Sequence, residues 1–414
     1  MNKLFDTYGE YVPGFFLIRL NKDLFEGIGW QDFDEEERAT LAHEYVHYLQ
    51  DITTTRGINN FIYVSKILQL NFASAYEKDI IKLPINIEQA ANKEAYIESE
   101  LQSFYQGDSE HKKIHHINKI VREEEEIVNS LLKKEESMYS INIYYDDKDM
   151  PYMVGNTAIA ESMAYLIEKS AFNGMNRDRE FPYNVCELIC EKYCSWMIKK
   201  TNVLVAACEL SLMHYHSGDM FWHIVQELAD KKLVFNTVDE FEKHFLKRTY
   251  FLYENLKDDF KEVQDCLDFL YPTNVPKLKE INDRLAQIVF KGYDYRDKKK
   301  LFIAKILEGS SALQMLSTWM NYFEIPIIMD KNNCIYAGSD LAIMVGPLAM
   351  YNFFMRRSGN DCGLINLCCA QRVFTFDAEI CNSKPWCQSQ KDQLCLFGMY
   401  WHLYSLDGKK VERE

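Results

Sequence analysis

Two periods of hydrophobicity alternate along the 414-residue chain. Most of the chain repeats apolar residues at the 3.6-residue spacing of a helix, and between 183 and 310 this pattern is almost continuous, with breaks at 217–219 and at Pro272. Shorter runs rich in aromatic and β-branched residues predict strands. We expect helices over about 35–53, 58–77, 87–106 and 110–136 and around Glu161, and strands over 15–20, 140–145, 150–154, 325–329 and 334–336, the last two paired around a turn at 330–333.

This pattern predicts a predominantly α-helical fold with a small α+β part at the amino-terminal end and a multi-helix carboxyl-terminal region. We expect three regions: residues 1–175 with the candidate chemistry, residues 176–310 with helices, and residues 311–414, which are rich in cysteine. A hydrophobic fraction of 47% and an aromatic fraction of 14% allow the chain to bury a large core.

Charge and hydropathy exclude two classes of partner. A formal net charge of −15 argues against duplex nucleic acid, because phosphate binding needs a basic surface. The first residues lack the charged and then apolar segments of a secretion signal. The longest uncharged apolar run, 341–355, contains Gly346 and Pro347 and is too short to span a bilayer. We therefore expect a cytoplasmic protein without a nucleic-acid or membrane partner.

The strongest chemical signal is the H-E-x-x-H sequence at residues 43–47. Positions i and i+4 share one face of a helix, so His43 and His47 can bind one metal ion while Glu44 points at its open side. Asp32 and Asp34 precede three glutamates at 35–37, which predicts an N-cap for the helix that carries the motif. Two imidazoles with an adjacent carboxylate favour a zinc site in which Glu44 is the general base.

A third protein ligand must come from elsewhere, and Glu161 is the best candidate. Alanines at 158, 160 and 164 surround it, so its helix can approach another helix closely. We expect Asn156 or Thr157 to cap this helix. Glu168, two turns further along, is expected to play no part in metal binding.

Other ligand sets are open at this stage. Glu94 and Glu98 are further candidates for the third ligand, whereas the glutamates of 123–126 are typical of a solvated helix face. The E-x-x-H part of the motif also occurs in di-iron helical bundles, but these need a second E-x-x-H, and the chain has none around its other histidines.

An H-E-x-x-H box followed by a helix with an isolated glutamate resembles the gluzincin branch of the zincin metallopeptidases. The resemblance covers roughly the first 175 residues. It implies a zincin-like amino-terminal part and a Zn²⁺-dependent peptidase that acts on a peptide or protein. In the thermolysin-like pattern the ligand glutamate follows the box more closely, and an aspartate lies four positions after it. Here 114 positions separate His47 from Glu161, and Tyr165 occupies the place of that aspartate.

Catalysis also needs a donor that stabilises the oxyanion of the reaction, and a strand edge often aligns a peptide substrate. His216 and Tyr215, beside a predicted helix break, are weak candidates for the donor. Either 140–145 or 150–154 is a candidate edge, or both form a hairpin that only covers the core. The runner-up function is an interaction or scaffold protein with a structural or vestigial metal site.

Twelve cysteines divide unevenly along the chain. Cys186, Cys190 and Cys194 share one helix face and are typical of a packed core. The carboxyl-terminal region is denser, although it has no C-x-x-C pair. Reduced, buried thiols are the default expectation there, and a second, structural metal is a minority hypothesis whose candidate ligands are Cys362, Cys368, Cys369, Cys381 and Cys395.

Overall fold

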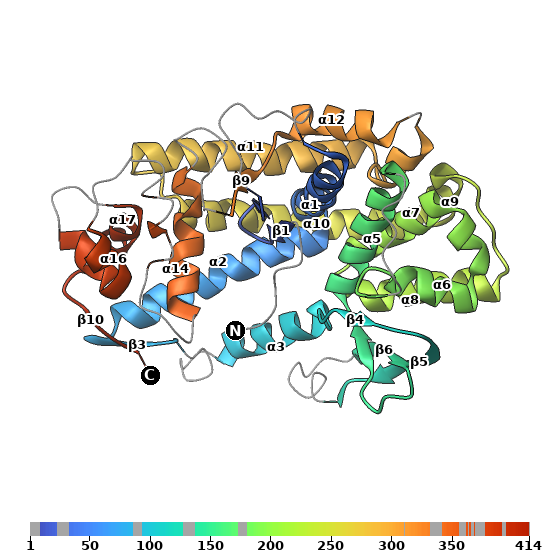
Figure 1. Ribbon diagram of the computed structural model, residues 1–414, viewed down its shortest axis with the longest axis horizontal. Helices are drawn as coiled ribbons and strands as arrows, with labels where there is room; N and C mark the ends of the chain where they lie inside the picture. The colour runs from blue at the N-terminus through green and yellow to red at the C-terminus, as the bar shows by residue number, and fades with distance from the viewer. Residues whose placement is uncertain are drawn as a thin grey trace.

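The computed structural model describes residues 9–22, 33–85, 93–126, 137–172, 180–309, 311–331, 342–355, 362, 364–365, 368, 377–390 and 395–413. Over these residues the chain is mostly helical (Figure 1), which confirms the predicted predominantly α fold. The helices are α1 (Glu35–Thr53), α2 (Thr55–Tyr76), α3 (Lys93–Gln106), α5 (Asn156–Ala171), α6 (Val185–Tyr193), α7 (Thr201–Leu212), α8 (Ser217–Asp230), α9 (Val238–His244), α10 (Leu246–Leu270), α11 (Pro276–Lys298), α12 (Ala312–Phe323), α14 (Gly346–Met355), α16 (Ala378–Ser383) and α17 (Leu396–Leu403), with short 3₁₀ helices η2 (Ser195–Lys199), η3 (Ala304–Glu308), η4 (Ala342–Val345) and η5 (Pro385–Gln390).

Four small sheets accompany the helices. β1 (Gly9–Val12) pairs antiparallel with β2 (Leu17–Leu20), which pairs parallel with β9 (Ile327–Met329). β5 (Ile117–Glu124), β6 (Tyr139–Tyr145) and β7 (Tyr152–Val154) form an antiparallel sheet with β6 in the middle. The remaining pairs are β3 (Ile80–Leu83) with β10 (Lys410–Arg413) and β4 (Lys112–Lys113) with β8 (Glu180–Phe181).

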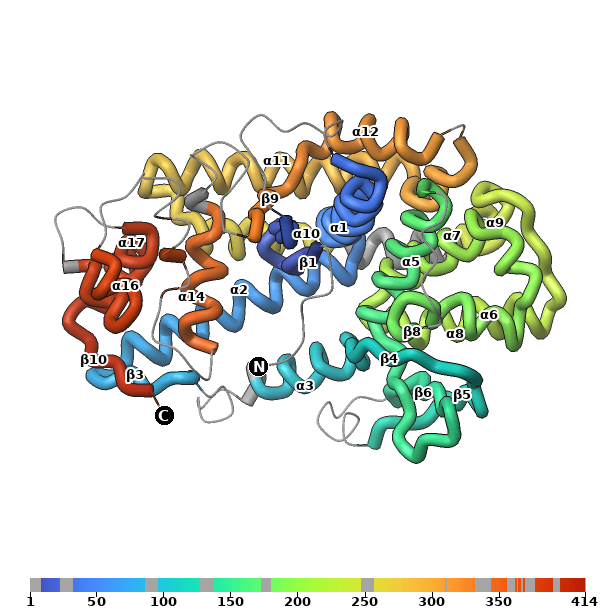
Figure 2. Tube along the Cα trace, viewed as in Figure 1, coloured from blue at the N-terminus to red at the C-terminus, as the bar shows by residue number. Residues whose placement is uncertain are grey.

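Helix α1 lies in the interior, as Figures 1 and 2 show. Asp34 accepts a hydrogen bond from the Glu37 backbone N–H at 2.9 Å, and the Glu37 side chain accepts one from Asp34 N–H at 2.9 Å. This capping box confirms the predicted helix start. Every residue from Leu41 to Thr53 is buried. α1 packs against α2, α5, α11 and β1, so elements from distant parts of the chain surround it.

A buried ion pair fixes the carboxyl-terminal end of α1. Arg296 of α11, only 1% exposed, donates to the Thr53 carbonyl at 2.9 Å and to Thr53 Oγ1 at 2.8 Å, and it pairs with Glu209 of α7. Glu209 also accepts backbone N–H groups of Ile303 at 3.1 Å and Ala304 at 2.7 Å. Both charges are therefore satisfied away from water, and three helices meet at the end of α1.

Two expectations about secondary structure differ from what the structure shows. The predicted helix over 110–136 is wrong where the structure describes it, because 112–113 and 117–124 are strands. The charged residues of β5 pair across the strand with aromatic rings, as when Lys119 Nζ lies 4.2 Å from the Tyr144 ring, so sheet pairing overrides local helix preference. The 325–329 strand forms as β9 but pairs with β2, while its predicted partner, 334–336, lies outside the described residues.

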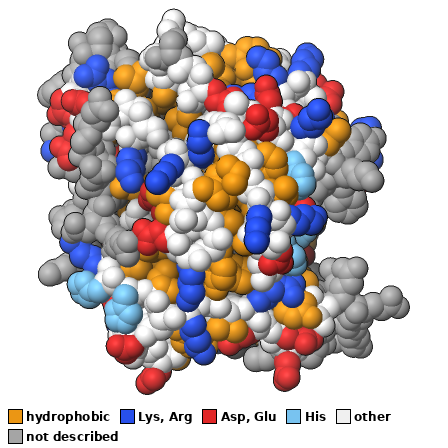
Figure 3. Space-filling model, turned by 90° about the vertical axis from the view of Figure 1, so that its right-hand side faces the viewer, with side chains coloured by type: hydrophobic (Ala, Val, Ile, Leu, Met, Phe, Trp, Pro, Cys, Tyr) orange, Lys and Arg blue, Asp and Glu red, His pale blue; other side chains and the backbone are white. Residues whose placement is uncertain are grey.

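No helix in the described ranges combines the length and apolarity that crossing a bilayer requires. The face at the right-hand end of Figure 1, over α6 to α9, mixes hydrophobic side chains with both acidic and basic ones (Figure 3). On this described face, charges of the two signs are interspersed rather than gathered into one large patch.

The close approach of α11 to α1 depends on a glycine. A Cβ atom at Gly292 would lie 2.4 Å from the carbonyl oxygen of Ile52, which no real contact allows. We expect Gly292→Ala to lower the free energy of unfolding by about 1–3 kcal/mol despite the better helix propensity of alanine, because backbone atoms must shift. Urea unfolding measures the change. Gly309→Ala is the control, since a Cβ there would meet only ordinary contacts, with the Met315 side chain at 3.7 Å and the Ile306 carbonyl oxygen at 4.0 Å. Equal stability of the two variants would contradict this packing argument.

Candidate metal centre

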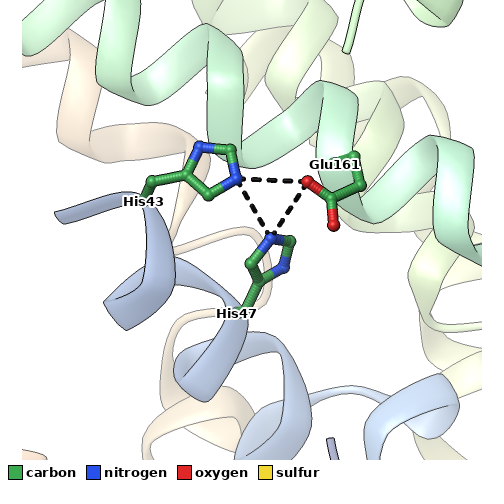
Figure 4. A group of neighbouring side chains, drawn as sticks. All are labelled: His43, His47 and Glu161. Atoms are coloured by element: carbon green, nitrogen blue, oxygen red, sulfur yellow. Dashed lines mark hydrogen bonds and ion pairs between the residues drawn. The ribbon is translucent and has the colours of Figure 1, made fainter. Parts of the chain in front are cut away.

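Three side chains from α1 and α5 converge on one point (Figure 4). His43 Nε2 lies 3.1 Å from Glu161 Oε2 and 3.2 Å from His47 Nε2, and His47 Nε2 lies 3.4 Å from Glu161 Oε2. Tetrahedral zinc with bonds of about 2.0–2.1 Å needs ligand atoms about 3.3 Å apart. The predicted trio therefore has the spacing of a single-ion site.

Each imidazole has a hydrogen-bond acceptor at its second nitrogen. Glu168 Oε2 lies 2.8 Å from His43 Nδ1, and Gln50 Oε1 lies 2.9 Å from His47 Nδ1. Gln50 in turn donates to the Ala160 carbonyl on α5 at 3.1 Å. Because these acceptors are oxygen atoms, both Nδ1 atoms carry a hydrogen, so each imidazole turns its Nε2 atom toward the shared point, where it could bind a metal ion in place of a proton.

Glu168, which was expected to play no part in metal binding, has a direct contact with a candidate ligand of the site. Glu168 lies seven residues after Glu161, close to two full turns, so both carboxylates project from the same face of α5. It supplies the orienting acceptor for His43, and its side chain is 5% exposed. Tyr165, which holds the position expected for that acceptor, is instead a fully buried core residue.

Burial and mutual attraction set the charges of the trio. Burial alone lowers the pKa of His43, but hydrogen bonds to Glu161 and Glu168 outweigh it and raise the pKa to about 10. For Glu161, burial raises the pKa, yet the neighbouring imidazoles hold it well below the usual range. A metal cation would replace the proton on His43, so metal binding would release protons and weaken at low pH.

Glu44 lies beside the trio without belonging to it. The residue is 7% exposed, and burial raises the pKa of its carboxyl against the lowering effect of His43 and His47. The backbone N–H of Tyr11, on β1, donates to this carboxylate. The Tyr11 ring stacks on His47 with centroids 6.3 Å apart. Glu44 is therefore held between the metal ligands and the outer edge of a strand.

Asp51, on α1, binds β1 and the turn after it. Its Oδ2 accepts the Tyr11 hydroxyl at 3.0 Å and the Gly14 N–H at 2.8 Å, and Arg56 lies 3.5 Å from Oδ1. Burial raises the pKa of Asp51, and Arg56 opposes the rise. The sequence held a signal for this residue, since Asp51 follows His47 by one further helical turn on the same face.

Helix α5 starts differently from the expectation. Neither Asn156 nor Thr157 caps it: Gly155 is the N-cap residue, without a side-chain cap. Asn156 Oδ1 instead accepts the Ser217 N–H at 2.9 Å, and Thr157 donates to Gln106 at 3.2 Å. These bonds tie the start of α5 to α8 and α3. The buried alanines at 158, 160 and 164 let α5 approach α1, as expected.

The two expected oxyanion donors have other partners. His216 is 3% exposed, stacks on Phe104 and caps α8 by accepting the Asp219 N–H at 3.0 Å. Burial lowers its pKa to about 4. Tyr215 donates to Asp259 of α10 at 2.8 Å. These contacts favour structural roles for both.

The remaining candidate ligands do not join the trio. Glu98 lies on α3 near Lys66, and the side chain of Glu94 is outside the described residues. In the described part of the chain, only His43, His47 and Glu161 bring three ligand atoms within 4.8 Å of one another, so the described cysteines form no second such group. Cys362 and Cys381 share a hydrogen bond, and this bond together with burial raises the pKa of Cys362. Cys368 and Cys395 are buried. Cys369 lies outside the described residues.

Comparison of the chain with protein-family models, with curated proteins and with solved structures finds no match.

We expect Glu168→Ala to weaken zinc binding by about 10- to 100-fold, because His43 loses the acceptor that orients it. Glu168→Gln keeps an acceptor oxygen and should recover most of the affinity. Competition with a fluorescent chelator measures the dissociation constant. Glu36→Gln, on the exposed first turn of α1, is the matched control. Unchanged affinity in Glu168→Ala would show that this carboxylate does not support the site.

His216 should make the protein sensitive to acid. Its pKa is about 4 in the folded protein and about 6.5 when unfolded, so the unfolded chain binds the extra proton between these values. Stability should therefore fall as the pH falls from about 6.5 to 4, by about 3 kcal/mol from this residue. His216→Asn keeps a capping side chain and should lose that part of the pH dependence. Urea unfolding at pH 7 and pH 4 measures the free energy of unfolding of His216→Asn and of His223→Asn, an exposed control. Equal acid sensitivity of the two variants would contradict the role of the buried His216 cap.

Proposed function

We propose that this chain is a zinc-dependent hydrolase of the gluzincin type that cleaves an amide bond in a peptide or protein. The observation that carries the proposal is the triangle of His43 Nε2, His47 Nε2 and Glu161 Oε2, with Glu44 buried next to it. Two imidazoles and one carboxylate are a donor set typical of catalytic zinc, which leaves one coordination position open. Glu161 is the most accessible member, with 26% of its side chain exposed.

In this proposal each residue of the centre has a separate role. His43, His47 and Glu161 would hold the ion, while Glu168 and Gln50 keep the imidazoles in the required tautomer. A bound Zn²⁺ lowers the pKa of a water molecule toward about 7 and polarises a carbonyl group. Glu44 accepts the proton of the attacking water and later delivers it to the amine nitrogen as the C–N bond breaks.

The strand beside Glu44 supports a peptide or protein as the proposed substrate. β1 is at the end of the order β1-β2-β9, so among the described residues no strand pairs with its outer edge. The backbone N–H of Tyr11, on β1, donates to Glu44, and this contact supports a role for the strand beside the proposed general base. An extended peptide can add to such an edge through backbone hydrogen bonds. Of the two edges expected from the sequence, β6 lies inside its sheet and β7 is an edge strand, but β1 has the direct link to Glu44.

We expect the purified protein to bind about one zinc ion per chain, and Glu44→Gln to retain it while losing roughly 10²- to 10⁴-fold of the turnover number on casein. Glutamine preserves the shape of the side chain but cannot accept the proton. His43→Ala and Glu161→Ala should lose the zinc itself. Metal analysis and a peptide-release assay give the two readouts, with Glu36→Gln as control.

A working peptidase whose turnover survives Glu44→Gln would refute the role of Glu44. Full zinc content in a His43→Ala, His47→Ala double variant would place the metal elsewhere. Zinc bound by the trio without any hydrolysis would instead favour a structural site.

A further inference from the structure

One aromatic residue of β1 contacts the metal-site helix at three successive points. The backbone N–H of Tyr11 donates to the Glu44 carboxylate, and its ring stacks on His47 with centroids 6.3 Å apart. Its hydroxyl donates to Asp51 Oδ2 at 3.0 Å. Glu44, His47 and Asp51 follow one another at intervals of three and four residues, so they share one face of α1. Tyr11, which is 7% exposed, therefore spans the face of α1 that carries the candidate chemistry.

Asp51 also anchors this strand at the point where it turns. Its Oδ2 accepts the Gly14 backbone N–H at 2.8 Å, just after β1 ends. Gly14 has a φ of 75°, and a Cβ there would lie 3.3 Å from Asn60 Nδ2 on α2. The turn therefore favours a residue without a side chain, and it lies against the start of α2. One carboxylate oxygen thus fixes both the side chain of Tyr11 and the end of its strand.

The negative charge of Asp51 has only a distant ion-pair partner. Arg56 Nη1 lies 3.5 Å from Asp51 Oδ1, which is a long contact, and the two side chains are 7% and 0% exposed. Arg56 Nε has no hydrogen-bond partner among the described residues. Burying such a pair is costly, and apolar residues of similar volume often give equal or greater stability. Fold stability alone is therefore a weak reason for an aspartate here, which favours a role in the site.

A general base has to be placed accurately. The carboxylate of a glutamate sits at the end of a flexible side chain, and it must lie within about 2.6–3.2 Å of the oxygen whose proton it accepts. An N–H group that binds one carboxylate oxygen leaves the other free to face the attacking water. Because Tyr11 is itself held at its ring and its hydroxyl, its N–H is a donor fixed relative to Glu44.

We propose that Tyr11 is a positioning residue for the general base Glu44 and that Asp51 acts through Tyr11 to hold it. The inference rests on the proposed hydrolase function, in which Glu44 takes the proton of the attacking water. Tyr11 and Asp51 set where the carboxylate points, so they affect turnover and leave zinc affinity unchanged. Their role thus differs from that of Glu168 and Gln50, which contact the imidazoles.

The contact between Tyr11 and Glu44 can be tested without a substrate. In NMR of protein with isotope-labelled tyrosine, the Tyr11 amide signal is identified by its loss in Tyr11→Phe. Glu44→Gln should move this signal upfield, because a neutral acceptor deshields an amide proton less than a carboxylate does. Asp51→Asn should speed the exchange of this amide with solvent about 10-fold, because the Tyr11 hydroxyl loses a charged partner. Glu36→Gln is the control and should change neither. An unmoved signal in Glu44→Gln, or an unchanged exchange rate in Asp51→Asn, would overturn the proposal.

The effect on the reaction is measured in the zinc-loaded protein. Tyr11→Phe keeps the ring and the backbone donor but loses the hydrogen bond to Asp51. It should keep its zinc and its KM for casein, while its turnover number falls about 10-fold because the base is held less accurately. Tyr63→Phe is the matched control, since it removes a part-buried hydroxyl that donates to Ser99 at 3.3 Å. The turnover number of Tyr63→Phe should match that of the wild type.

A double variant distinguishes positioning from a general loosening of the structure. If Tyr11 acts through Glu44, Tyr11→Phe should lower the residual turnover of Glu44→Gln by less than about twofold, whereas loosening would lower it by the same factor of about 10. Wild-type turnover in Tyr11→Phe, or equal losses in the two backgrounds, would overturn the assignment. If the amide signal responds as expected but casein is not cleaved, the contact between Tyr11 and Glu44 stands and the peptidase proposal fails instead.

Discussion

The structure depends on one constraint, which is that a stripe of polar side chains on α1 is buried and must be paired there. His43, Glu44, His47, Gln50 and Asp51 are all less than 10% exposed. An unpaired polar or charged group in the interior costs several kcal/mol, so each of these needs a partner from another element. β1 supplies the backbone and hydroxyl of Tyr11, and α5 supplies two carboxylates. The geometry of the candidate metal centre and the stability of the fold thus depend on the same contacts.

The geometry of the centre therefore depends on residues that lie far from it in the sequence. The side chains of the centre and their immediate partners come from residues near 10, 50 and 160, so the centre needs three segments that lie far apart in the sequence to pack together. The Arg296–Glu209 pair holds the end of α1 through the backbone of Thr53. Removing one partner of a buried ion pair usually costs about 3–5 kcal/mol, since the other charge stays buried. Substitutions at Arg296 should therefore disturb the centre through the position of α1.

Local features of the centre could be predicted from the sequence, and non-local ones could not. The i, i+4 histidines and the Asp34 capping box are defined within one helix, and the alanines around Glu161 indicated a close helix contact. The partner of His43 was missed because i, i+7 spacing places Glu168 on the right face but does not show what that face meets. β5 was mistaken for a helix because its charged residues are stabilised by tyrosines on β6, which only the paired strands bring together.

The central claim is that His43, His47 and Glu161 form one zinc site with two nitrogen ligands and one oxygen ligand from the protein. X-ray absorption at the zinc edge of the purified, zinc-loaded protein tests it most directly. We predict nitrogen and oxygen scatterers at about 2.0–2.1 Å with the outer-shell pattern of two imidazoles, and no sulfur. A spectrum dominated by sulfur at about 2.3 Å would contradict the account, because it would assign the zinc to cysteines.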